Sequence, residues 1–164
     1  MKTTKHLVLL ALLAAIIFVQ EEILTFLPNI RLTVFLLVLY SKKLGMKDTL
    51  IIVVIHTLLD NLVMGSLNPM VITTMLVGWG LVPILLNTVF KKLNDNLSLA
   101  FCGILFALIY SWLFVAISTT VFQMNFWTYV KADIIFEIAL AASSFLSILW
   151  LYNPCGRVFD KLNK

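Results

Sequence analysis

Long apolar segments dominate this chain and decide what it can fold into. Of its 164 residues, 62% are hydrophobic and only 12% are charged, whereas soluble domains are about half apolar and about a quarter charged. A soluble fold of this length would need many more polar side chains to cover its core. The composition therefore predicts an integral membrane protein whose outer surface is covered by the bilayer.

Charged residues, Pro, Gly and Asn divide the apolar sequence into six segments, and a spanning helix needs about 20 mainly apolar residues. The segments run from about His6 to Leu27, Ile30 to Tyr40, Asp48 to Met64, Pro69 to Phe90, Leu97 to Phe122, and Tyr129 to Tyr152. The second is too short to span by itself, so we expect it to be tilted, partly re-entrant or packed inside the bundle. The expected fold is all-α, a single domain over residues 1–164 with about six transmembrane helices.

Positive charge predicts the orientation of this bundle, because cytoplasmic loops are enriched in Lys and Arg. With the N-terminus inside, ten of the twelve basic residues fall on the cytoplasmic side, and only Arg31 and Lys131 fall outside. The ten are Lys2, Lys5, Lys42, Lys43, Lys47, Lys91, Lys92, Arg157, Lys161 and Lys164. Five or seven spans would destroy this alternation, so we expect both termini to be cytoplasmic.

A secretory signal peptide is an alternative interpretation of the first segment, since Lys2 and Lys5 precede its apolar run. Gln20, Glu21 and Glu22 follow that run without a small-x-small cleavage site. Cleavage would also leave an odd number of spans. We therefore expect the first segment to be retained as a helix.

The acidic residues follow a different pattern from the basic ones. Five of the eight lie within apolar segments or at their outer ends: Glu21, Glu22, Asp60, Asp133 and Glu137. A carboxylate near the bilayer centre costs about 2.5–3.5 kcal/mol on insertion scales, so such residues usually face a cavity and carry function. The pattern predicts a wet pocket near the outer face. The alternative for Glu21, Glu22 and Asp133 is a position among the lipid headgroups.

Aromatic residues accompany these acids. Trp79 and Trp112 lie within apolar segments, where each could stack on a ligand ring or fill the bundle. Trp127 and Tyr129 stand where the aromatic belt of a membrane interface is expected. We therefore expect only the first two to contribute to a pocket.

His56 and Asp60 lie four residues apart on one predicted helix face, where they could hold a metal or support acid–base chemistry. The only other histidine, His6, lies at the inner mouth of the first segment. A lone histidine within the membrane is more often a hydrogen-bonded structural residue. We therefore expect no metal site and no catalytic residue.

Small residues mark a different surface of the first segment. Ala11 and Ala15 are four residues apart, with Ala14 alongside, and this spacing lets another helix approach closely. Ala139, Ser143 and Ser147 repeat the spacing in the last segment. Each stripe predicts close helix packing, either within the chain or with a partner.

Together these features resemble the substrate-binding S component of energy-coupling factor (ECF) vitamin transporters. The likeness covers nearly the whole chain: a small bundle with both termini inside, an Ala-x-x-x-Ala motif in the first helix and a polar outer pocket. Two stretches are more specific, LPNIRLT at residues 27–33 and ADIIFE at residues 132–137.

The resemblance implies capture of a water-soluble vitamin or precursor at the outer face of a prokaryotic plasma membrane. A shared transmembrane subunit and two ATPases would then drive its release inside, and Ala11, Ala14 and Ala15 would contact that subunit. We expect the ligand to be bound by Glu21, Glu22, Asn29, Arg31, Asp60, Trp79, Trp112, Asp133 and Glu137.

ATP use is expected to belong to the partners. The chain has no GxxxxGK[ST] phosphate loop, so the partner ATPases would use ATP and Mg²⁺, and this chain would be a transport subunit and not an enzyme. A thiamine precursor, a pyridoxine-like compound and a cobalamin-type ligand are all open. The acidic excess argues against a strongly anionic ligand.

An intramembrane enzyme is the alternative function. Glu21-Glu22, Arg31 and His56-x-x-x-Asp60 are similar to the signature of the membrane CAAX-protease-like family. The chain departs from that signature because Arg31 comes nine residues after Glu22 and a second intramembrane histidine is missing. No Phe precedes His56 at the expected spacing either. An accessory or structural membrane protein is a further alternative.

Overall fold

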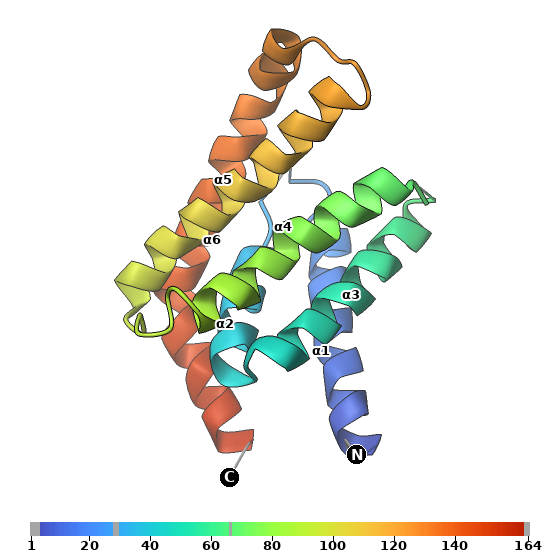
Figure 1. Cartoon of the computed structure of the whole chain (residues 1–164). Helices are drawn as coiled ribbons and strands as arrows, with labels where there is room; N and C mark the ends of the chain where they lie inside the picture. Colours follow the sequence, from blue (N-terminus) through green and yellow to red (C-terminus); the bar gives the residue numbers. More distant parts are fainter. Residues whose placement is uncertain (1–3, 28–29, 66, 163–164) are drawn as a thin grey trace.

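A computed structural model of the chain describes residues 4–27, 30–65 and 67–162, and all regular secondary structure in these ranges is helical. The helices are α1 (Thr4–Ile23), α2 (Thr33–Lys43), α3 (Met46–Val63), α4 (Pro69–Asn87), α5 (Asn96–Thr120) and α6 (Phe126–Leu162). Successive helices reverse direction, and the first residue of α1 lies at the same end of the bundle as the last residue of α6 (Figure 1). The predicted all-α fold is confirmed.

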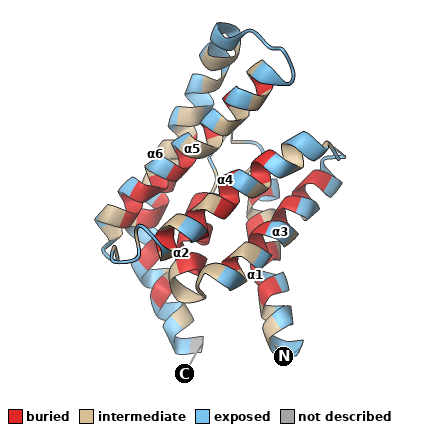
Figure 2. Cartoon of the chain, in the orientation of Figure 1, coloured by how far each residue is buried: buried red, intermediate tan, exposed pale blue. Residues whose placement is uncertain are grey.

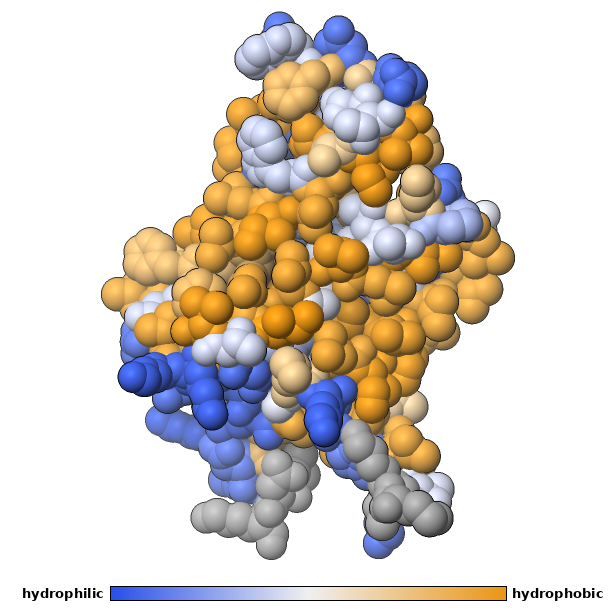
Figure 3. All heavy atoms as spheres, viewed as in Figure 1, coloured by the Kyte–Doolittle hydropathy of each residue, from blue (hydrophilic) through white to orange (hydrophobic). Residues whose placement is uncertain are grey.

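Four of these helices, α1, α4, α5 and α6, are long and apolar enough to cross a membrane. Apolar side chains cover the middle of the molecule in one face-on view, and hydrophilic residues gather toward the end that carries the termini (Figure 3). Such a surface is favourable against lipid, whereas its exposure to water costs free energy. Helix length and composition therefore indicate a membrane protein.

The short helix α2 lies in the centre of the bundle and contacts α3, α4, α5 and α6 as well as α1. Every residue from Thr33 to Ser41 is buried. A helix that is apolar on all sides is stable only where neighbours surround it, and Figure 2 shows the buried faces of the surrounding helices turned toward the interior. Of the three expected arrangements for this segment, packing inside the bundle is the one observed.

Local signals in the sequence set the helix ends. Asn68 and Asp95 precede α4 and α5, and their side chains accept hydrogen bonds from the backbone N–H groups of Met70 (3.0 Å) and Ser98 (2.8 Å). The bond from Ser98 lowers the pKa of the Asp95 carboxyl below its ordinary value. Gly45, between α2 and α3, has a φ of 86°, a backbone conformation that glycine adopts more readily than other residues.

Helix α6 extends ten residues further at its C-terminal end than the sequence predicted, because it continues past Tyr152 and through Pro154 to Leu162. The extension is held against the end of α2. Lys43 Nζ lies 2.7 Å from Asp160 Oδ1, and the rings of Tyr40 and Phe159 pack with centroids 5.7 Å apart. These contacts between distant segments stabilise a helix that local sequence alone would end near the proline.

Candidate ligand-binding site

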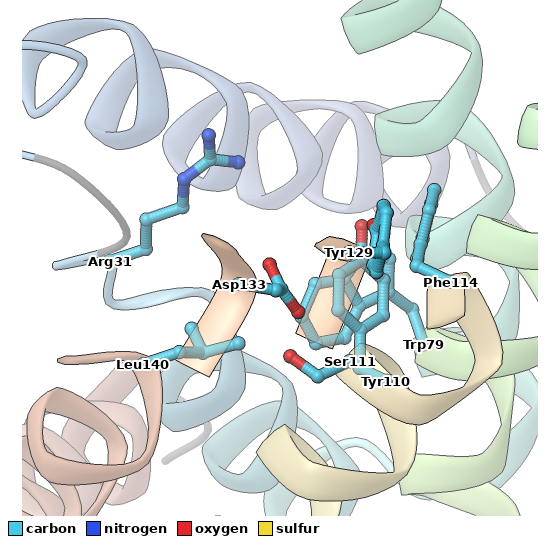
Figure 4. A pocket seen from close by; sticks show the side chains of 8 residues that line it. All are labelled: Arg31, Trp79, Tyr110, Ser111, Phe114, Tyr129, Asp133 and Leu140. Atoms are coloured by element: carbon cyan, nitrogen blue, oxygen red, sulfur yellow. The ribbon is translucent and has the colours of Figure 1, made fainter. Parts of the chain in front are cut away.

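A cavity of about 160 Å³ lies among α4, α5, α6 and the connector that precedes α2. Eight residues line it (Figure 4): Arg31, Trp79, Tyr110, Ser111, Phe114, Tyr129, Asp133 and Leu140. Arg31 follows the end of α1 and Tyr129 stands in the first turn of α6, so both come from the end of the bundle opposite to the termini. The cavity therefore lies in that half of the molecule.

Aromatic rings form one wall of the cavity. The rings of Trp79 and Tyr110 stack with centroids 3.8 Å apart, and Phe114 follows one helical turn later at 5.0 Å from Tyr110. Gly78 makes the stack possible, because a Cβ at this position would lie 2.8 Å from Tyr110 Cδ2. The close packing of α4 against α5 therefore forms this aromatic wall.

Asp133 is the acidic residue of the cavity (Figure 4). It is half-buried, and among the described residues it has no hydrogen bond or ion pair. The hydroxyl of Ser111, on α5, lines the same space. A carboxylate that is partly withdrawn from water and has no partner in its own chain is able to bind a cation or a hydrogen-bond donor.

Arg31, by contrast, already has a partner. Its Nη1 lies 3.6 Å from Oε1 of Glu21, which is only 4% exposed. The Thr33 hydroxyl donates to the same Glu21 oxygen, and Gln20 Oε1 accepts from the Leu32 backbone N–H at 2.9 Å. The last turn of α1 therefore fixes the connector that carries Arg31 into the cavity wall.

A second set of polar side chains lies beyond Arg31, between α1 and α3. His56 Nε2 is 3.5 Å from Glu21 Oε2, and Asp60, one turn further along α3, is 3% exposed. Glu21 Oε2, both ring nitrogens of His56 and Asp60 Oδ1 are buried without a hydrogen-bond partner among the described residues. Since an unpaired buried polar group costs about 1–3 kcal/mol, these atoms need water or a ligand as partners.

The structure thus brings together Glu21, Arg31, His56 and Asp60 in one polar group, and Arg31, Trp79 and Asp133 around one cavity. His56 and Asp60 do not line that cavity. No set of three His, Cys, Asp or Glu residues within the described ranges has the geometry of a metal site.

Other predicted ligand-binding residues lie elsewhere. Trp112 is 53% exposed and donates from Nε1 to Glu137 Oε1 at 3.0 Å, on the outer surface of α5 and α6. Glu22 is exposed at the end of α1. Neither Glu22 nor this pair lines the cavity. Asn29 lies outside the described residues, as do Lys2 and Lys164.

The alanines of α1 face in two directions. Ala14 is completely buried within the chain, whereas Ala11 is exposed and Ala15 is half-exposed. Ala15 lines an apolar groove along the outer side of α1. Of the three alanines, Ala11 and Ala15 are therefore the ones that reach the surface of the bundle.

Sequence reasoning missed several lining residues. Tyr110, Ser111, Phe114 and Leu140 belong to helices that are apolar almost all round, so no periodicity marked their inner face. Tyr129 was expected in an aromatic belt, yet it lines the cavity. The spacing of Tyr110 and Phe114, i and i+4, was the one available signal for a shared face.

Fold and site together define a membrane-type helical bundle with a polar and aromatic cavity in one half. No family model, curated protein or solved structure matches the chain, so the description of this class rests on the fold and the site alone.

Proposed function

We propose that this chain captures a small water-soluble vitamin or precursor at the outer face of a prokaryotic plasma membrane, as the substrate-binding subunit of an ECF-type importer. The observation that carries the proposal is the cavity of charged and aromatic residues in the half of the bundle away from the termini. Lipid-facing structure does not need such a cavity, whereas a receptor for a polar ligand does.

The proposed orientation has six passes with both termini in the cytoplasm. Ten of the twelve basic residues would then be cytoplasmic, as the positive-inside rule requires. The alternating direction of the six helices supports this arrangement (Figure 1). Helix α2 is too short to span the bilayer by itself. In this arrangement it makes its pass while surrounded by the other helices.

The volume of the cavity limits which ligands can fit. About 160 Å³ is well below the roughly 300–1,000 Å³ of sites for drug-sized molecules. A cobalamin-type ligand is far too large for it. A single-ring compound, such as a thiamine precursor or a pyridoxine-like molecule, is the favoured class.

Helix α1 supports a division of labour with a partner. Its buried residues form one stripe, Leu10, Leu13, Ala14, Ile17 and Glu21, and in the described structure α1 packs against α3 and α2 alone. On the side of α1 away from this stripe, Ala11 is exposed and Ala15 is half-exposed. Small residues there would let a helix of the shared transmembrane subunit approach closely, while two partner ATPases use ATP and Mg²⁺.

Replacing either alanine by tryptophan tests this docking. Ala11→Trp and Ala15→Trp should block both association with the shared subunit and uptake, because a bulky ring holds the two helices apart. Ligand binding by the isolated chain should be unchanged. The measurement is a pull-down from detergent together with radiolabelled uptake, and Ala142→Trp, at an exposed alanine of α6, is the matched control. Intact association in both α1 variants would contradict the proposed surface.

An intramembrane hydrolase is the second candidate, because His56 lies 3.5 Å from Glu21 with Arg31 on the other side of that carboxylate. His56→Gln separates the two functions. A receptor should retain measurable uptake, since His56 does not line the cavity. A hydrolase that depends on this imidazole should lose all peptide cleavage in a membrane protease assay, and cleavage by the wild-type chain that His56→Gln abolishes would favour the enzyme.

A further inference from the structure

The charges around the cavity point to the kind of ligand that it accepts. We propose that the cavity binds a small organic cation of about one ring, with the Asp133 carboxylate as counter-ion and the surrounding aromatic rings as its walls. This inference rests on the proposed receptor function and adds the charge of the substrate to it.

The charges that line the cavity do not balance. Arg31 and Asp133 are the two charged residues that line the cavity. Arg31 is neutralised from behind by Glu21, at 3.6 Å, whereas Asp133 has no ion pair among the described residues. The field in the cavity therefore favours a positive ligand.

Aromatic rings make up half of the cavity lining. Trp79, Tyr110, Phe114 and Tyr129 supply four of the eight lining residues. The face of an aromatic ring attracts a cation through its quadrupole, and the attraction grows when the cation is withdrawn from water. A cavity with one uncompensated carboxylate and four rings thus combines the two groups that recognise ammonium and ring-nitrogen cations.

The cavity also offers a group that can form hydrogen bonds. The Ser111 hydroxyl lies in the same lining. A ligand that carries a hydrogen-bonding group besides its positive charge would pair with this hydroxyl, which can both donate and accept. An aminopyrimidine or hydroxypyridine type of ring has both features.

Three single-ring probes test the sign of the ligand charge: benzylammonium, benzyl alcohol and benzoate. Binding to the purified full chain in detergent is measured by titration calorimetry at pH 7. Benzylammonium should bind at least about tenfold more tightly than benzyl alcohol, because it adds a charge-assisted bond to the same ring. Benzoate should bind most weakly of the three.

Two substitutions locate the effect. Asp133→Asn should weaken benzylammonium binding about tenfold or more and leave benzyl alcohol nearly unchanged. Phe114→Leu should weaken it about two- to thirtyfold through the lost ring. Asp95→Asn removes one carboxylate at the opposite end of α5, where asparagine also caps the helix, and it should change nothing.

A preference for benzoate, or equal binding of all three probes, would overturn the inference while the receptor function stands. Full benzylammonium affinity in a folded Asp133→Asn protein would overturn it as well. Failure of every probe to bind the wild-type chain also counts against a small cationic ligand. The receptor function itself is judged separately, by the ligand that the protein retains from cells. The probe comparison on the wild-type chain needs no variant to fold.

Discussion

Gly78 is the residue on which the aromatic wall of the cavity depends. It lies next to Trp79 in α4, and the space that a side chain would occupy is taken by the ring of Tyr110. Any Cβ at this position must push that ring, because real Cβ contacts do not reach 2.8 Å. The displaced ring belongs to the wall, since it stacks on Trp79 and lies 5.0 Å from the Phe114 centroid.

Gly78→Ala should therefore weaken ligand binding about two- to fivefold, the contribution of one misplaced aromatic contact. Its effect on thermal stability should be small, because about 1 kcal/mol of helix propensity gained offsets the crowding. Gly80→Ala is the matched control, since its Cβ would meet only Leu50 Cδ2 at 3.7 Å. The measurement is calorimetry with the ligand recovered from the wild-type chain. Equal binding by both variants would show that the wall does not position the ligand.

The positions of single residues were the hardest to predict, because the sequence does not show how each helix is rotated about its own axis. Asp133, Arg31 and Trp79 were expected in the pocket, and the structure places all three in its lining. Trp112 was expected beside them, but it is one residue from Ser111 and so about 100° around the same helix. In a helix as apolar as α5, composition does not show which face is inside. Only the packing of α4 and α6 against α5 decides it.

At the scale of elements, the pair α5 and α6 forms the long arm of the molecule (Figure 1). Its close contact depends on Gly103, where an added Cβ would lie 2.5 Å from Ile148 Cδ1 and 3.5 Å from the Ser144 carbonyl oxygen. Ile148 is completely buried, so its side chain has no free space to move into. The two helices can meet at this point because one of them has no side chain.

Gly103→Leu should separate α5 from α6 and destabilise the protein by at least about 1–3 kcal/mol, the usual range for overpacked cores. Both helices contribute to the cavity, so ligand binding should fall together with stability. A thermal unfolding scan in detergent, with Gly80→Leu as the control at a looser contact of α4, measures the difference. An unchanged unfolding temperature would mean that α5 and α6 do not pack as described.

Elements were largely predictable from sequence because lipid imposes long apolar stretches. All six expected segments are helices, with ends that differ by a few residues from those expected. The exception is α6, whose last ten residues depend on Lys43 and Tyr40 of the distant α2. Local sequence contains no information about such a contact, so the extension could not be predicted.

At the scale of the whole molecule, the arrangement separates two surfaces. The cavity lies in the half opposite to the termini, while the free face of α1 runs along the side of the bundle. The sequence predicted that acidic residues would gather in one half, because charge and hydropathy vary along each segment. Which helices would enclose the cavity was not predictable, since helices of similar hydropathy can be arranged in several ways.

The central claim is that the isolated chain captures a small ligand without ATP. Native mass spectrometry of the protein, purified from cells supplied with all B vitamins, tests it most directly. We predict one single-ring molecule per chain, which rebinds to the emptied protein in the absence of nucleotide. A protein that is repeatedly empty, and that binds none of these vitamins when they are added back, would contradict the account.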